Sequence, residues 1–99
     1  MAKKLRRSSG NVFRDLGFPA AEAENLRIRS ELMARLRRMI EAEGMTQAAA
    51  ARRFGVTQPR ISNLVRGRIE LFSIDTLVNM LAKAGVRVTV TARTRTRAA

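Results

Sequence analysis

Residues Thr46 to Gly67 read T-Q-A-A-A-A-R-R-F-G-V-T-Q-P-R-I-S-N-L-V-R-G, and this stretch holds the strongest structural signals in the sequence. Thr46 is a residue type that favours the N-cap of a helix, and Gly55 is suited to end that helix. Thr57 can cap a second helix, whose first turn tolerates the proline that follows. The alanines of the first helix let two helix backbones approach closely. The stretch therefore predicts two short helices joined by a tight glycine turn.

The second of these helices presents a polar face once its apolar side chains turn inward. Ile61, Leu64 and Val65 have the spacing of a buried helix face. Two short helices joined in this way form a helix-turn-helix, a motif that places its second helix in the major groove of DNA. We therefore expect the side chains of this helix and its cap to contact bases. They are Thr57, Gln58, Pro59, Arg60, Ser62 and Asn63.

The chemistry of these side chains suits the edges of base pairs. The amide of Gln58 can bind N6 and N7 of adenine, and the guanidinium of Arg60 can bind O6 and N7 of guanine. The ring of Pro59 can press on a thymine methyl group. We expect phosphates to be held at the two ends of the motif. The candidates are Thr46 and Gln47 at the start, and Arg66 and Arg68 after the second helix. The alternative for each side chain is an ordinary solvated helix face.

The charge balance favours a polyanionic partner. The chain has a net charge of +12, with 20 Lys and Arg residues against 8 Asp and Glu residues. Seventeen of the basic residues are arginine, whose planar guanidinium suits phosphate and guanine recognition. A genome rich in G and C would also raise the arginine content, but it would not explain the shortage of acids. Charge alone is equally consistent with a basic protein that coats nucleic acid without sequence preference.

The composition disfavours catalysis and metal binding. The sequence contains no cysteine and no histidine, so it lacks the commonest metal ligands and the usual general base. It also shows no paired-carboxylate or phosphate-loop signature. We expect no enzymatic activity, no metal and no cofactor. Because the basic N-terminus is not followed by an apolar run, and no stretch is long enough to span a bilayer, we expect a cytoplasmic protein without membrane contact.

The chain divides into three parts. We expect residues 1–10 to form a flexible basic arm, residues 11–92 to form the helix-turn-helix domain, and residues 93–99 to form a basic tail. The arm is either a solvated terminus or a segment that lies along a DNA groove. The segment Asn11–Phe18 is rich in apolar residues, and we expect it to dock on the domain or on a partner.

Two further helices complete the domain. One is expected from Pro19 to Glu43, and a break near Asn25 is the alternative because a helix of this length is long for a globular protein. The other begins at the cap Ser73 and ends at Gly85. The predicted fold is mainly α: a repressor-like DNA-binding domain of four to five helices with one C-terminal β-strand.

The predicted strand rests on alternation. Val86, Val88 and Val90 alternate with polar residues, which is the period of a half-buried strand. No second strong strand is found in the sequence, and an unpaired strand edge invites pairing with another chain. We therefore expect Val86–Ala92 to pair with its copy across the two-fold axis of a homodimer. The alternative is pairing with Asn11–Phe13 of the same chain.

The motif resembles a known family. Thr46-Gln47, the alanines, the run Phe54–Ser62 and Gly67 resemble the Cro/repressor-like (XRE-type) DNA-binding domains. A wider set of stretches resembles the XRE-type antitoxins of the HigA kind over about Ser9 to Val90. These stretches are Ser9–Phe18, Gln58–Leu64, Phe72–Leu77 and Gly85-Val86.

This resemblance carries implications for partners and sites. It implies a dimer that binds its own promoter, and a partner toxin of the RelE/HigB kind, which is an mRNA-cutting ribonuclease. Phe54, where family members commonly have leucine, affects packing only, and the Arg-Thr tail is an addition to the family pattern. The DNA-contacting positions that the resemblance implies are Gln47, Thr57, Gln58, Arg60, Ser62 and Asn63.

The functional hypothesis that follows is a dimeric, sequence-specific repressor of an inverted-repeat operator, acting as the antitoxin of a type II toxin–antitoxin pair. One alternative is a stand-alone or phage-derived regulator without a toxin. Another, from a different class, is the non-specific coating protein. The sequence does not identify the operator or the surface that would hold a toxin.

Overall fold

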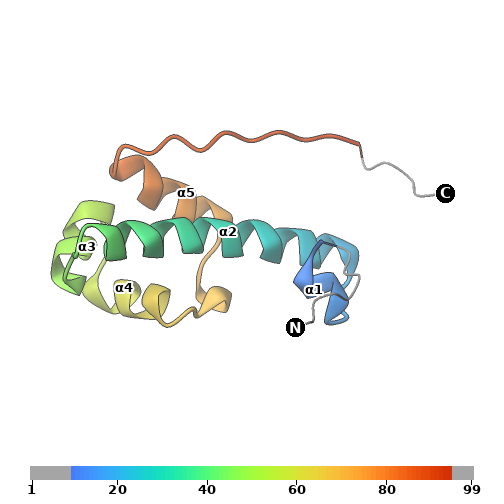
Figure 1. Ribbon diagram of the computed structural model, residues 1–99, viewed down its shortest axis with the longest axis horizontal. Coiled ribbons are helices and arrows are strands. Elements are labelled where there is room, and N and C mark those ends of the chain that lie inside the picture. Colours follow the sequence, from blue (N-terminus) through green and yellow to red (C-terminus); the bar gives the residue numbers. More distant parts are fainter. Residues whose placement is uncertain (1–9, 95–99) are drawn as a thin grey trace.

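A computed structural model describes residues 10–94, which are helical or irregular throughout (Figure 1). The elements are α1 (Val12–Asp15), α2 (Ala20–Ala42), α3 (Gln47–Phe54), α4 (Gln58–Val65), the 3-10 turn η2 (Ile69–Leu71) and α5 (Ile74–Lys83). Apart from Gly10, the predicted basic arm lies outside the described residues. So does the predicted basic tail beyond Thr94.

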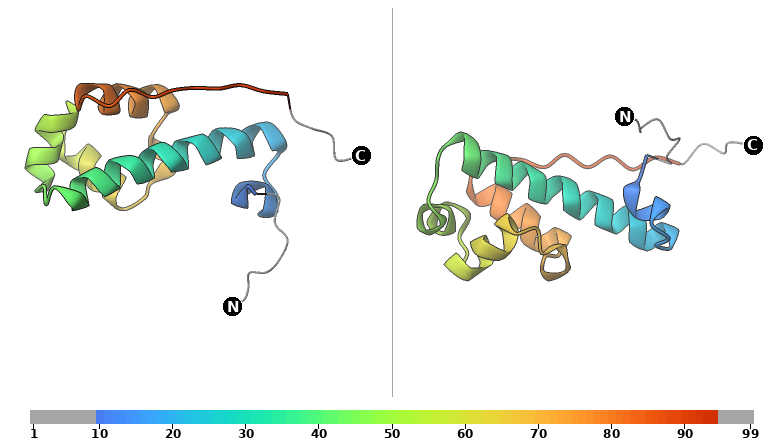
Figure 2. Two further views of the ribbon diagram at one scale, coloured as in Figure 1. Left: turned by 45° about the horizontal axis from the view of Figure 1, so that its top comes forward. Right: turned by 60° about the horizontal axis from the view of Figure 1, so that its bottom comes forward.

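The helix α2 is the axis of the molecule. It runs without interruption from Ala20 to Ala42, so the alternative of a break near Asn25 is not realised. The helix α1 packs against the N-terminal part of α2. The helices α4 and α5 also pack against α2, and α3 packs against α4 and α5 (Figures 1 and 2). Charged side chains are spread along α2, and no helix within residues 10–94 is long and apolar enough to cross a membrane.

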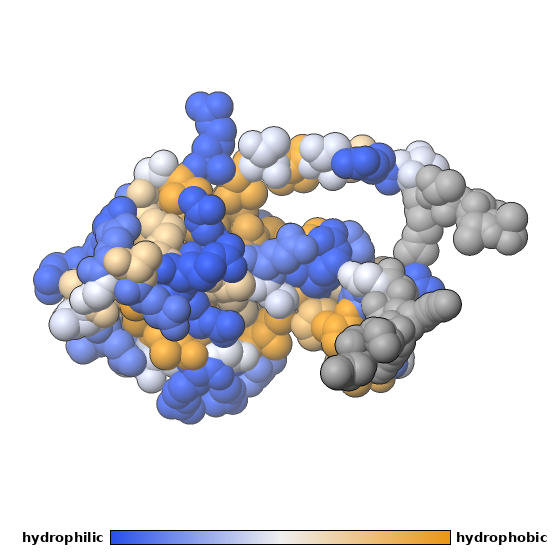
Figure 3. Space-filling view, in the orientation of Figure 1, coloured by the Kyte–Doolittle hydropathy of each residue, from blue (hydrophilic) through white to orange (hydrophobic). Residues whose placement is uncertain are grey.

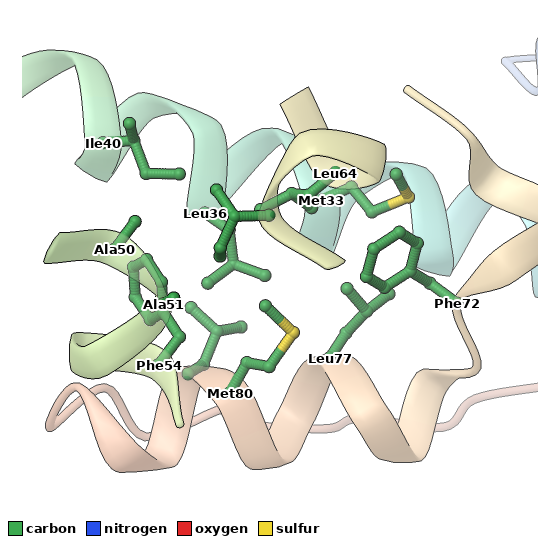
Figure 4. Packing of buried hydrophobic residues seen from close by; sticks show 12 residues of the cluster. Met33, Leu36, Ile40, Ala50, Ala51, Phe54, Leu64, Phe72, Leu77 and Met80 are labelled. Atoms are coloured by element: carbon green, nitrogen blue, oxygen red, sulfur yellow. The ribbon is translucent and has the colours of Figure 1, made fainter. Parts of the chain in front are cut away.

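The main hydrophobic core fills the space between α2, α3, α4 and α5. Figure 4 shows Phe54 at one end of this core and Phe72 at the other. Helices of eight residues such as α3 and α4 are marginal in isolation, so burial of their apolar faces stabilises them. The buried residues of this core are Met33, Leu36, Ile40, Ala50, Ala51, Phe54, Ile61, Leu64, Phe72, Leu77, Met80 and Leu81.

The predicted helix starts are confirmed by their caps. The side-chain oxygens of Thr46, Thr57 and Ser73 each accept a hydrogen bond from the backbone N–H three residues further on, at 3.0, 3.3 and 3.1 Å. Each cap satisfies one of the N–H groups that a helix leaves without an internal partner. Gly85 follows the end of α5 as predicted, and the N–H of Val86 donates to the carbonyl of Leu81 at 2.9 Å.

The predicted C-terminal strand is wrong. Residues 86–94 run as an irregular, extended segment beside α2 and α5, and the described chain contains no β-strand (Figures 1 and 2). Val86 and Val88 do pack against the main core, but Val90 is 82% exposed. The alternation of valines with polar residues therefore reflects packing of Val86 and Val88 against helices and not membership of a sheet. The alternative pairing with Asn11–Phe13 is also wrong, because α1 begins at Val12.

Candidate nucleic-acid interface

The turn between α3 and α4 depends on Gly55. Its φ of 71° lies in the left-handed region, which costs a residue with a Cβ roughly 1–2 kcal/mol. The N–H of Val56 donates to the carbonyl of Ala51 at 3.0 Å and closes the end of α3. A Cβ at position 55 would lie 2.5 Å from Cδ of Lys83, so α5 packs directly on this turn. The backbone and α5 together fix how α4 leaves α3.

The inner faces of α3 and α4 are complementary in size. Ala50, Ala51 and Phe54 of α3 are buried, and so are Ile61 and Leu64 of α4. The small alanine side chains let α4 lie close to α3, as the sequence predicts. Val65 departs from the prediction. It is 44% exposed, and it lies at the end of α4, where the helix leaves the core.

The outer face of α4 presents most of the predicted base-contacting side chains. Gln58 and Pro59 are exposed at its first turn, Ser62 and Asn63 are half-buried, and Arg66 is exposed at its end. At 3.6 residues per turn, Pro59, Ser62, Asn63 and Arg66 lie on the side opposite to the buried residues of α4. We call these five residues the α4 outer face. Contact with bases remains a prediction for Gln58, Pro59, Ser62 and Asn63, and contact with phosphate remains a prediction for Arg66.

Arg60 has a different position from the rest. Its Nη1 donates to the carbonyl oxygen of Leu71 at 2.9 Å, and its guanidinium carbon lies 5.4 Å from the centre of the Phe72 ring. This stacking is a cation–π contact. Arg60 therefore ties α4 to the segment that follows η2. To contact guanine as predicted, its guanidinium would have to leave these partners.

The same segment is held from α2. Nη1 of Arg29 donates to the carbonyl oxygens of Ile69 at 3.1 Å and Phe72 at 3.3 Å, while its Nε donates to Oδ1 of Asn25 at 2.7 Å. Arg29 of α2 and Arg60 of α4 thus satisfy carbonyl groups of the stretch 69–72, which includes η2. These bonds hold the link between α4 and α5 in place.

The side chains predicted to contact phosphate differ in whether they already have a partner within the protein. Gln47 and Arg66 are exposed. Arg68 is already paired, since its Nε lies 2.8 Å from Oε2 of Glu70. Glu70's own backbone N–H and, after it, Arg68 lower the pKa of the Glu70 carboxyl below its ordinary value. The Thr46 hydroxyl accepts the cap hydrogen bond of α3, which leaves its own proton free to be donated.

The sequence prediction missed Arg37. In the sequence, Arg37 is only a cation near the end of a long predicted helix, where the dipole favours positive charge. In the structure, a Cβ at Gly67 would lie 3.4 Å from Nη1 of Arg37. The guanidinium of Arg37 therefore reaches the turn after α4, between Arg66 and Arg68 in the sequence. No local pattern could reveal this, because the two positions come together only in the folded chain.

The charge of the motif is of one sign. Residues 44–69 contain five arginines and no aspartate or glutamate. One of them, Arg53, pairs with Glu43 just outside the stretch at 2.6 Å. A surface of this kind attracts phosphate groups and releases their counterions on binding.

The geometry and charge define a helix-turn-helix domain of the kind that docks on duplex DNA. The sequence matches the helix-turn-helix domain family over residues 12–93, and the chain belongs to that family. A solved structure of a proposed XRE-family transcriptional regulator is similar with a TM-score of 0.70 and 31% identity, covering 79% of this chain and 88% of that one. No curated protein matches the sequence. The chain is an XRE-type helix-turn-helix protein.

Proposed function

We propose that this XRE-type protein is a sequence-specific transcriptional repressor that binds an inverted-repeat operator as a homodimer. The observation that carries the proposal is the α4 outer face, which presents amide, hydroxyl and guanidinium groups within a segment of five arginines and no acids. Side chains of these types discriminate base edges in the major groove. The similar XRE-family structure supports regulation as the purpose of that contact.

We assign a proposed role to each residue of the site. Base contacts belong to Gln58, Pro59, Ser62 and Asn63, with Thr57 and Arg60 beside them. Phosphate contacts belong to Thr46, Gln47, Arg66 and Arg68, and we add Arg37. Arg37, Arg66 and Arg68 lie around the turn after α4 and would hold the DNA backbone at the C-terminal end of that helix.

Dimerisation is proposed from the geometry of DNA. A single α4 is eight residues long and reads only part of a helical turn. Two copies related by a two-fold axis would place their α4 helices about 34 Å apart, one turn of DNA, on an inverted repeat. Sedimentation of the protein on a DNA fragment with one repeat tests this. Two copies per fragment support the proposal, and one copy contradicts it.

We further propose that the protein is the antitoxin of a type II pair and represses its own operon. The support is the resemblance to HigA-type antitoxins over about Ser9 to Val90. The partner would be a ribonuclease of the RelE/HigB kind. A small reading frame for a basic protein next to this gene supports the antitoxin role. Its absence favours the stand-alone regulator.

The deciding experiment is a selection of genomic fragments by the purified protein at near-physiological salt, read by sequencing. Recovery of one inverted repeat upstream of the protein's own gene establishes a specific autoregulator. Recovery of fragments at random contradicts the proposal. It would mean that charge and not the α4 outer face dominates binding, and the coating protein would become the better explanation.

A further inference from the structure

The end of the molecule away from α3 and α4 carries an exposed apolar surface. Val12 and Leu16 are 60% and 70% exposed, and Phe18, two residues further on, is 40% exposed. The N–H of Leu16 donates to the carbonyl of Val12 at 3.0 Å, so these two side chains lie on one side of α1. We call these three residues the α1 patch. Figure 3 shows apolar residues at this end of the molecule.

The α1 patch is held in a fixed position by Asn11. This side chain is 8% exposed, and its Oδ1 accepts hydrogen bonds from the N–H groups of Phe13 and Arg14 at 2.9 and 3.3 Å. Its Nδ2 donates to the carbonyl of Ala23 in α2 at 3.1 Å. A helix of four residues has no stability of its own. The asparagine therefore both caps α1 and attaches it to α2.

The packing under the patch is separate from the main core. Ala23 and Leu26 of α2 are buried at this end, yet neither belongs to the core between α2 and α5. The rings of Phe13 and Phe18 lie edge to face, 6.2 Å apart. A surface that is ordered before it meets a partner loses little conformational freedom on binding. Exposed apolar side chains grouped on such a surface mark an interaction site.

The charge around the patch differs from that of the DNA-binding motif. Residues 11–31 hold four of the chain's eight acids, Asp15, Glu22, Glu24 and Glu31, against three arginines. One of those arginines, Arg27, is paired with both Glu24 and Glu31, at 2.5 and 2.7 Å. In a chain of net charge +12, this stretch has a net charge of −1. A basic protein would be repelled less strongly by it than by the motif.

We infer that the α1 patch is the docking surface for a basic protein with an apolar recess, in which Val12, Leu16 and Phe18 are buried. The inference rests on the proposed antitoxin function, whose partner would be a basic ribonuclease. The patch lies at the N-terminal end of α2. The helices α3 and α4 lie around the other end of α2 (Figure 1). Because α2 is 23 residues long, about 34 Å separates its ends. The protein can therefore hold its partner and its operator at the same time.

The test uses the full chain and the protein encoded by the adjacent reading frame, with affinity measured by titration calorimetry. Val12→Ser combined with Leu16→Ser removes the apolar contacts and leaves the charges unchanged. The matched control is Val65→Ser combined with Leu71→Ser, which removes the same residue types from exposed positions outside the α1 patch. We expect the α1 variant to bind the partner about tenfold more weakly or worse. The control should stay within about twofold of the original chain.

Operator binding and sedimentation of the α1 variant complete the test. Unchanged operator affinity shows that the variant is folded. Unchanged partner affinity overturns the α1 patch as the docking surface and leaves the antitoxin role standing. Failure of the original chain to bind the adjacent protein overturns the antitoxin role and this inference together. If the α1 variant becomes monomeric while the original chain is a dimer, the patch joins two copies of this chain, and the inference is also wrong.

Discussion

At the scale of single residues, Arg60 has partners within the protein and a proposed partner in DNA. In the free protein it stabilises the fold through the Leu71 carbonyl and the Phe72 ring. We expect Arg60→Ala to lower the free energy of unfolding by about 1–2 kcal/mol, since it loses one hydrogen bond and one cation–π contact. Urea denaturation measures this. The control is Arg66→Ala, an exposed position on the same helix, which should change stability by less than about 0.5 kcal/mol.

Base recognition is better tested at Asn63, which belongs to the α4 outer face. Asn63→Ala should cost about 1–3 kcal/mol on the operator and much less on random DNA, because an amide that reads a base edge carries sequence information. Arg66→Ala should weaken binding to both DNAs equally. Competition titrations with the two DNAs measure the difference. Equal losses for Asn63→Ala would remove it from the base-contacting set.

Gly55 links backbone conformation to DNA binding. Gly55→Ala should lower the free energy of unfolding by about 1 kcal/mol from its positive φ, and it must also displace the Lys83 side chain from the turn. Gly85→Ala is the matched control, because its φ of 84° is similar but a Cβ there meets nothing within 4 Å. Thermal unfolding should show similar losses for both. Only Gly55→Ala should weaken operator binding, and a loss shared by Gly85→Ala would contradict this.

At the scale of the helices, α1 depends on one side chain. Asn11→Ala removes the cap of α1 and its bond to α2, and each such loss costs about 1 kcal/mol. We expect hydrogen exchange of the α1 amides to become fast while the amides of α4 and α5 keep their protection. Asn11→Asp is the informative companion, because it retains the cap and loses the donor to Ala23. Continued protection of α1 in both variants would show that apolar packing alone holds it.

The sequence predicts the helix boundaries well, because the signals for them are local. Thr46, Thr57 and Ser73 cap helices wherever the chain can form them, and each bonds a backbone N–H three residues away. The segment Asn11–Phe18 packs against α2, which is one of the two outcomes expected from its apolar content.

Contacts between distant residues escape this kind of prediction. The approach of Arg37 to Gly67 and the attachment of Arg60 to Leu71 depend on how the helices pack. The valines at 86 and 88 show the same difficulty. Alternation predicts that one side of a segment is buried, but it does not say whether a sheet or a pair of helices covers it. Here α2 and α5 do so, with Ile28 and Val78 among the residues that line the groove beside Val88.

At the scale of the whole molecule, the phosphate contact proposed for Arg37 of α2 predicts a measurable change in salt dependence. Each phosphate contact contributes about 0.9 to the slope of log K against log salt. We expect Arg37→Ala to reduce that slope by about 1 on operator and random DNA alike. Arg38→Ala, an exposed neighbour on the same helix, should leave the slope unchanged. Identical slopes for the two variants would remove Arg37 from the interface.

The separate packing beneath α1 has a consequence for how such proteins diversify. Ala23 and Leu26 are buried at the α1 end of α2 and do not belong to the main core. Mutations at that end can therefore accumulate under their own selection, while the residues proposed to contact the operator stay fixed. A gene duplicate could in this way exchange one protein partner for another and keep its promoter. The reverse exchange, at the outer face of α4, would retarget the same partner to a new gene.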